Sequence, residues 1–346
     1  MSAVNILKFG ISSPGDTSPL EELKRAGYDA SQIIAVIGKT EGNGCVNDFS
    51  RTLAAVVWEP LIPKDAITIF SGGTEGVLSP HVAFIVRAKE GVETGLVAAV
   101  THTRDFEPHE IGTKFQAGEV ANEVGKVLDD AEFGQASLVL IKCPLLTTSK
   151  IDSIKARGRV PLTTDTYESM ALSRYASAVG IKAAEAGRMY QDHALVGKIV
   201  ESIDEGSHRA GWSRIASCSS GAELENCHIL VLGTSKTPGK LRTISTIMED
   251  AIDAASILRS LEQIKQEGGE VLQVFAKAEA DPTGLVRGKR HTMSTDSDIH
   301  GTRHARAAVG CLLAGLTGDT QIYVSGGAEG QGPPGGGSLV FVYRVP

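Results

Sequence analysis

A recurring set of lysines, arginines and serines in this sequence offers the chemistry of a Ser/Lys hydrolase. A serine hydroxyl attacks a carbonyl group only when a base removes its proton. A lysine is such a base once burial or neighbouring positive charge lowers its pKa from about 10.4 toward neutrality. Arginine stays charged and binds carbonyl or anionic oxygens, while backbone N–H groups beside the serine stabilise an oxyanion. Such a set therefore combines a lysine base, an arginine that binds a substrate oxygen and a serine nucleophile.

These residues occur three times in the same order. Each lysine ends an apolar run that predicts a buried strand, and the runs are IIAVIGKTEG with Lys39, SLVLIKCPLL with Lys142 and VLQVFAKAEA with Lys277. A helix-like segment follows each, namely DFSRTLAAVVWEP with Arg51, ALSRYASAVGIKAAEAG with Arg174 and TRHARAAVGCLLAGL with Arg303 and Arg306. A second strand then ends in a turn, ITIFSGGTEG with Ser71, IASCSSGAEL with Ser219 and IYVSGGAEG with Ser325.

The repetition decides how these residues are interpreted. A single lysine at a strand end is usually solvated, and a single SGG turn usually reflects only the conformational freedom of glycine. Here the linkers diverge while the same residue types persist at matching places, which indicates internal repeats that share one site. We predict an α/β fold of three homologous units, with residues 1–102, 103–245 and 246–346 as their ranges. Three equivalent sets around one cavity suit a planar ring with alternating carbonyl and N–H groups.

Composition excludes several classes of protein. Hydrophobic residues make up 42% and charged residues 22% of the 346 residues, as in ordinary globular proteins. No apolar run approaches the roughly 20 residues that span a bilayer, and the N-terminus lacks a signal-peptide pattern, so we expect a cytoplasmic protein. The net charge of −7 and the lack of a basic stripe argue against nucleic acid as a partner. The five cysteines form no CxxC pair and are expected to be free thiols.

Several longer blocks resemble a known family. GKTEGNGCVNDFSR, SGGTEGVLSPH, VTHTRDFEPHEIG, IKCPLLTTSKI, PLTTDTYESMALSR, VFAKAEADPTGLVRGKRHTMSTDSDIHGTRHARA and VSGGAEGQGPPGGGS are similar to the ring-opening amidohydrolases of the cyanuric acid hydrolase and barbiturase family. The resemblance covers nearly the whole chain and is stronger to the cyanuric acid hydrolases. It implies three repeats around a pseudo-threefold axis, with a central shared active site, and a homotetramer.

The resemblance also implies a role for each motif residue. Ser219 would be the nucleophile and Lys142 its base. The substrate ring would be held by arginines, serine turns and the remaining lysines, namely Arg51, Arg174, Arg306, Ser71, Gly72, Ser219, Ser220, Ser325, Gly326, Lys39 and Lys277. Arg306 is favoured over Arg303 because its distance to Ser325 in the sequence matches that of Arg51 to Ser71, whereas helical phase argues for Arg303. Only the second unit reads SSG, so Ser220 marks it as the catalytic one.

The expected reaction is opening of the cyanuric acid ring to carboxybiuret, which decarboxylates to biuret. Three alternatives remain: a barbiturase, a non-catalytic protein that binds cyclic ureides, and a Ser/Lys amidase for linear amides. The first would turn over barbituric acid, the second would have no need of a lysine with a lowered pKa, and the third would hydrolyse linear amides.

The C-terminal loop GGAEGQGPPGGGS raises the possibility of a metal site. Loops rich in carbonyl and carboxylate oxygens suit Mg²⁺ or Ca²⁺. From the residues alone, a Gly/Pro-rich turn without an ion is the more economical interpretation. The resemblance instead implies a structural ion, with ligands from Glu279, Ala328, Gln331, Gly332, Pro333 and Gly336. No metal is expected in the chemistry itself.

Overall fold

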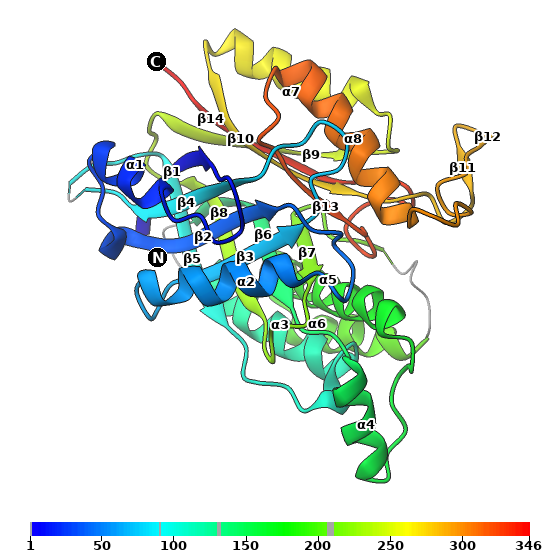
Figure 1. Ribbon diagram of the computed structural model, residues 1–346. Coiled ribbons are helices and arrows are strands. Elements are labelled where there is room, and N and C mark those ends of the chain that lie inside the picture. The colour runs from blue at the N-terminus through cyan, green and yellow to red at the C-terminus, as the bar shows by residue number, and fades with distance from the viewer. Residues whose placement is uncertain (1, 90, 130–132, 206–210) are drawn as a thin grey trace.

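Two large sheets and the helices that cover them build this chain (Figure 1). The computed structural model describes residues 2–89, 91–129, 133–205 and 211–346. Within them, one sheet has eight strands and the other has four, and a short hairpin is formed by β11 (Leu285–Val286) and β12 (Lys289–Arg290). The fold is therefore of the mixed α/β class that the sequence predicts.

The same succession of elements occurs three times along the chain. The first consists of β1 (Ser2–Gly10), α1 (Pro19–Arg25), β2 (Ile33–Thr40), α2 (Phe49–Trp58), β3 (Ile67–Gly72) and β4 (His81–Arg87). The second consists of β5 (Leu96–His102), α3 (Lys114–Leu128), β6 (Phe133–Cys143), α5 (Thr166–Tyr190), β7 (Ala216–Ser220) and β8 (His228–Ser235). The third consists of β9 (Leu241–Met248), α7 (Ala254–Gln266), β10 (Glu270–Ala278), α8 (Gly301–Thr317), β13 (Tyr323–Gly326) and β14 (Gly337–Arg344). The second is longer, because α4 (Thr148–Ala156) and α6 (His193–Glu201) are added to it.

Strand pairing repeats together with the element order. The strands lie in the orders β1-β4-β2-β3, β5-β8-β6-β7 and β9-β14-β10-β13. Each group has two antiparallel pairs and then one parallel pair, which is β2 with β3, β6 with β7 or β10 with β13. A short antiparallel pairing of β1 with β5 joins the first two groups into the eight-stranded sheet.

The strand pattern restarts earlier than the predicted boundaries. The second group begins at β5 and the third at β9, whereas the predicted boundaries lie after residue 102 and after residue 245. The first boundary therefore falls at the end of β5 and the second inside β9. The lysine motifs mark only the middle strand of each group, so they cannot locate the strand that opens it. Helix α7 begins at Ala254, after residues 245–248 have completed β9 against β14.

Three groups of strands face one shared core. Alternate residues of a strand point to opposite faces of the sheet, and Ile37, Leu140 and Phe275 all lie in this core. The opposite faces are covered by helices: α1 and α2 on the first group, α3 and α5 on the second, α7 and α8 on the third (Figure 1). Strands buried on both faces explain why the lysine-bearing segments are continuous apolar runs.

The arginine-bearing helices begin at capping residues that the sequence supplies. Asp48, Asp165 and His300 precede α2, α5 and α8, and each accepts a hydrogen bond from a backbone N–H of the first turn. Within the described residues, no helix combines the length and the apolar character that crossing a membrane would require.

Candidate active site

The predicted lysines and serines lie in register on neighbouring strands. In the parallel pairs, Lys39 lies opposite Ser71, Lys142 opposite Ser219 and Lys277 opposite Ser325. Each lysine follows a residue of the shared core by two positions, as Lys277 follows Phe275. Side chains two residues apart share a face of a strand, so all three lysines point to the side where the groups of strands meet.

A small cavity lies where these strand ends converge. Its lining residues come from all three groups and are Gly44, Arg51, Ser71, Gly72, Lys142, Met170, Arg174, Ser219, Ser220, Arg306, Ser325 and Gly326. Ten of these twelve are predicted site residues, and the sequence analysis missed Gly44 and Met170, which belong to no recurring motif. Lys39 and Lys277 do not line the cavity and lie behind the serines that do.

The second lysine–serine pair differs from the other two. Lys39 Nζ donates a hydrogen bond to Ser71 Oγ at 3.2 Å, and Lys277 Nζ donates to Ser325 Oγ at 3.0 Å. Lys142 Nζ instead donates to the backbone oxygen of Ser220 at 3.1 Å. The hydroxyl of Ser219 donates to the backbone oxygen of Ile141 at 3.4 Å. The predicted dyad is thus adjacent in register, but no hydrogen bond joins the two side chains in the described part of the chain.

Burial lowers the pKa of each lysine ammonium. It lowers the pKa of Lys142 to about 8, with Glu223 opposing and Arg51 adding to the shift. It lowers the pKa of Lys277 to about 7, with Arg174 adding to the effect. The pKa of Lys39 is also well below its ordinary range. Desolvation is the larger cause in all three and arginine charge the smaller one, so lysines of this site can act as bases near neutral pH.

Two arginines of the cavity are clamped by glutamates from a different strand group. Arg306 binds Glu75 through Nε at 2.7 Å and Nη2 at 2.6 Å. Arg174 binds Glu329 through Nε at 2.9 Å and Nη2 at 2.7 Å. Such bidentate pairs fix the guanidinium plane. These glutamates follow their serines by four residues, as Glu223 does in the second group. The sequence analysis missed this fourth recurring position, although the same comparison of repeats would have found it.

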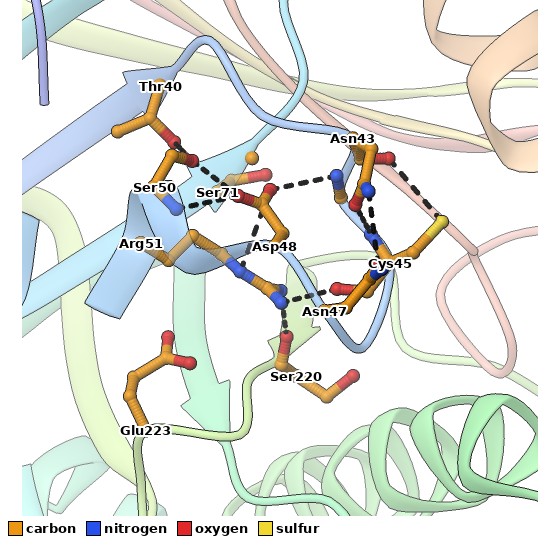
Figure 2. A network of polar contacts seen from close by, with 12 residues as sticks. Thr40, Asn43, Cys45, Asn47, Asp48, Ser50, Arg51, Ser71, Ser220 and Glu223 are labelled. Atoms are coloured by element: carbon orange, nitrogen blue, oxygen red, sulfur yellow. Dashed lines mark hydrogen bonds and ion pairs between the residues drawn. The ribbon is translucent and has the colours of Figure 1, made fainter. Parts of the chain in front are cut away.

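The third arginine lacks such a clamp. Arg51 donates from Nη1 to the backbone oxygen of Ser220 at 2.7 Å and from Nη2 to that of Cys45 at 2.6 Å (Figure 2). Its Nε lies 3.8 Å from Asp48 Oδ2 and makes no hydrogen bond in the described structure. In Figure 2 the Glu223 carboxylate points toward the Arg51 side chain, but no hydrogen bond joins them.

Packing explains why two turns read SGG and one reads SSG. A Cβ atom added at Gly72 would lie 1.6 Å from Asp48 Oδ2, and one at Gly326 would lie 2.6 Å from Arg306 Nη1. At the equivalent place Ser220 is accommodated, and its hydroxyl donates to the backbone oxygen of Met170 at 3.4 Å. These two glycines line the cavity and also make room for Asp48 and Arg306.

Arg306 and Arg303 both contact the Glu75 carboxylate, but from different places. Arg306 is buried and lines the cavity. Arg303 is 35% exposed, and its Nε contacts Glu75 at 3.2 Å from outside the cavity. The choice of Arg306 from sequence spacing therefore agrees with its position at the cavity.

The loop predicted to bind a metal surrounds a buried acid. Burial, together with nearby Glu329, raises the pKa of Glu279 to about 7, and Gly335 N donates to Glu279 Oε2 at 3.0 Å. Two neighbouring carboxylates favour a cation between or beside them. The side-chain oxygen of Gln331 accepts a hydrogen bond from Cys218 N at 2.5 Å and keeps a second lone pair. In the part of the chain that is described, no group of three or more His, Cys, Asp or Glu side chains could hold a metal, so a cation there would depend on backbone carbonyls.

Comparison with known proteins reveals similarity along the whole chain. A family model described as amidohydrolase ring-opening protein matches residues 5–344. A cyanuric acid amidohydrolase of Sarocladium sp is 64% identical over 350 residues, which cover 100% of this chain and 99% of that protein. The cyanuric acid amidohydrolase of Pseudomonas sp. (strain ADP) is 44% identical over 378 residues and covers 100% of both chains.

Solved structures agree with these sequence matches. A cyanuric acid hydrolase structure, presented as evolutionary innovation by structural concatenation, superposes with a TM-score of 0.88 at 41% identity and covers 99% of both chains. The crystal structure of the A. caulinodans enzyme superposes with the same TM-score at 38% identity, over 100% of this chain and 99% of that one.

Proposed function

Because this chain belongs to the family of ring-opening amidohydrolases, we propose that its central cavity hydrolyses one C–N bond of cyanuric acid. The chain is a hydrolase that acts on cyclic amides, and the observation that carries its substrate is 64% identity to a cyanuric acid amidohydrolase over the full chain. The cavity is also polar in the way that this substrate requires, since its lining includes three arginines and four serine hydroxyls.

We further propose that the three strand groups are repeats around a pseudo-threefold axis, and that the ring binds on this axis. The recurring strand order and the three equal Lys–Ser registers support this arrangement. Cyanuric acid has three carbonyls and three N–H groups in alternation. Arg51, Arg174 and Arg306 would each bind one carbonyl oxygen, while the serine turns would face the ring edges.

In the proposed reaction Ser219 Oγ forms a bond to a ring carbonyl carbon while Lys142 Nζ takes the hydroxyl proton. Backbone N–H groups of the serine turn stabilise the oxyanion. The intermediate collapses with cleavage of the ring C–N bond, and the Lys142 ammonium returns the proton to the leaving nitrogen. Water then hydrolyses the acyl-enzyme to carboxybiuret, which loses carbon dioxide to give biuret. Lys142 must exchange the Ser220 carbonyl for the Ser219 hydroxyl in the first step, and their adjacent register makes this a side-chain movement.

Turnover of cyanuric acid and barbituric acid by the same preparation tests the substrate. We expect cyanuric acid to be opened and barbituric acid to bind without turnover. A ring carbon in place of an N–H leaves a buried polar partner unpaired, which costs about 1–3 kcal/mol. Hydrolysis of either ring is measured as the loss of its ultraviolet absorbance. Faster hydrolysis of barbituric acid would assign the chain to the barbiturase branch.

We also propose a structural divalent cation, Mg²⁺ or Ca²⁺, beside Glu279. The buried Glu279 carboxylate near Glu329 supports it, as do the carbonyls of the Gly/Pro-rich loop. Backbone oxygens of Ala328, Gly332, Pro333 and Gly336 would complete the ligands, together with the second lone pair of the Gln331 side-chain oxygen. The cation would stabilise the loop that follows Ser325.

A cytoplasmic homotetramer is the last part of the proposal. Support comes from α2, where Phe49, Leu53 and Val56 lie three and four residues apart on one face and are 75%, 49% and 66% exposed. A contiguous apolar stripe on a surface helix is typical of an interface. Sedimentation velocity should report four chains, and Leu53→Glu should shift the distribution toward smaller species.

A further inference from the structure

Glu223 breaks the pattern set by its two equivalents. Glu75 and Glu329 each hold the Nε and Nη2 atoms of an arginine from another strand group. Glu223 Oε1 instead lies 3.5 Å from Lys142 Nζ, and Glu223 Oε2 is buried without a hydrogen bond in the described structure. The arginine that matches this pattern, Arg51, has an Nε that is likewise without a hydrogen bond.

The backbone of the turn differs in the same place. Gly73 and Gly327 have positive φ values of 97° and 81°, whereas Gly221 at the equivalent position does not have a positive φ. All three donate the same hydrogen bond to the residue after the lysine, at 2.9 Å in each case. The chain therefore leaves the second turn in another direction, and the glutamate that follows is directed toward Lys142.

We propose that Glu223 is a positioning residue of the hydrolysis, which orients Lys142 and supplies the counter-charge to the ammonium that forms when Lys142 takes the Ser219 proton. This inference rests on the proposed function. The arrangement would extend the Ser–Lys pair to a Ser–Lys–Glu relay, in which a third group orients the base. In the other two strand groups the same position serves to hold an arginine, which explains why only one of three similar lysine–serine sets would be catalytic.

Charge and burial around Lys142 support this role. The Lys142 and Glu223 side chains are only 2% and 8% exposed, so water screens their attraction poorly. The other charged or titratable groups facing Lys142 are Arg51, Asp48, Cys143, Lys39 and His228. Burial opposes ionisation of Glu223, yet Lys142 and Arg51 hold its pKa below the usual range, so the carboxylate is charged when the proton is transferred.

Acylation passes one proton from this relay to the substrate. The proton moves from Ser219 Oγ to Lys142 Nζ as the C–O bond forms, and it moves on to the ring nitrogen as the C–N bond breaks. Glu223 remains ionised throughout and gains or loses no atom. Its contribution is electrostatic, because it stabilises the ammonium intermediate more than the neutral amine that precedes it.

The pH dependence of kcat/KM in Glu223→Gln tests this role. An opposite charge within about 4–6 Å shifts a pKa by about 1–3 units. In the pH profile, kcat/KM rises along one limb as Lys142 loses its proton. Removal of the Glu223 charge should therefore move this limb to lower pH by about one unit or more, and kcat should fall by about 10²-fold. Glu75→Gln is the matched control at the equivalent position: it loosens Arg306, so KM should rise while the limb stays in place. Glu223→Asp keeps the charge and should retain the wild-type limb with a reduced kcat.

The results for the Glu223 and Lys142 variants separate the role of Glu223 from the Ser–Lys mechanism. If the limb of Glu223→Gln coincides with that of the wild type and Lys142→Ala is inactive, the role of Glu223 is overturned. The Ser–Lys mechanism then remains intact. Turnover by Lys142→Ala would instead refute the proposed mechanism. Should Glu223→Gln not fold, as judged by thermal melting, Glu223→Asp is decisive, since an unchanged kcat in that variant also overturns the role.

Discussion

Substitution of Gly72 by serine would make the first turn read SSG, like the second. The new Cβ would lie 1.6 Å from Asp48 Oδ2, so Asp48 has to move. Asp48 accepts hydrogen bonds from Gly44 N at 2.8 Å and from Ser50 N at 3.0 Å, and it caps α2. Loss of the cap costs about 1 kcal/mol, and a hydrogen bond to a charged acceptor contributes about 1.5–3 kcal/mol. We therefore expect Gly72→Ser to lower the free energy of unfolding by about 2–4 kcal/mol.

The same change should weaken substrate binding. Asp48 is the acid nearest to Arg51 Nε, at 3.8 Å. A displaced Asp48 leaves Arg51 less well oriented, so we expect KM for cyanuric acid to rise at least about tenfold, the range of a lost charged contact. Thermal melting, with an expected decrease of about 5 °C, and steady-state kinetics measure the two effects.

Ser220→Gly is the matched control for this substitution. It removes a hydroxyl whose contacts with Met170 O at 3.4 Å and Arg174 Nη1 at 3.5 Å are long for hydrogen bonds. The melting temperature of this variant should therefore stay close to that of the wild type. A Gly72→Ser protein with wild-type melting and wild-type KM would refute the reasoning that packing against Asp48 excludes a side chain there.

Three further predictions concern the reaction and the loop. Ser219→Ala and Lys142→Ala should each lower kcat by about 10³-fold or more, and the double variant should be little worse, because paired groups act as a unit; additive losses measured by steady-state kinetics would contradict this. Since neutral Lys142 is the reactive form and its pKa is about 8, kcat/KM of the wild type should rise with pH through about 8 and then level off; a profile that is flat from pH 6 to 10 would exclude Lys142 as the base. Glu279→Gln should abolish the increase in melting temperature that Mg²⁺ or Ca²⁺ produces in the wild type, and a wild-type melting curve that chelator leaves unchanged would count against the cation.

Local patterns in the sequence were sufficient for the strands that carry the lysines and serines, for the helices that carry the arginines and for the polar motifs. The run that ends at Lys142 is apolar because its strand is buried on both faces. Such a run can be recognised as a strand from the sequence alone. Repetition then identified the lysines, arginines and serines as one set, and the structure brings ten of the predicted residues to one cavity. Burial as a cause of a lowered lysine pKa also follows from the strand prediction, because a lysine at the end of a buried strand faces the core.

Tertiary structure decided which members of the set differ. The contact of Arg306 with Glu75 joins residues 231 positions apart, and the turn that directs Glu223 to Lys142 differs from its equivalents by the sign of one φ angle. The reason for a glycine at position 72 is likewise an oxygen of Asp48, 24 residues away. Repeat motifs specify residues that all three units share, because the same local fold requires them three times. The asymmetry that selects one catalytic unit depends on atoms from different units within a few ångströms of each other, and only the folded chain defines those distances.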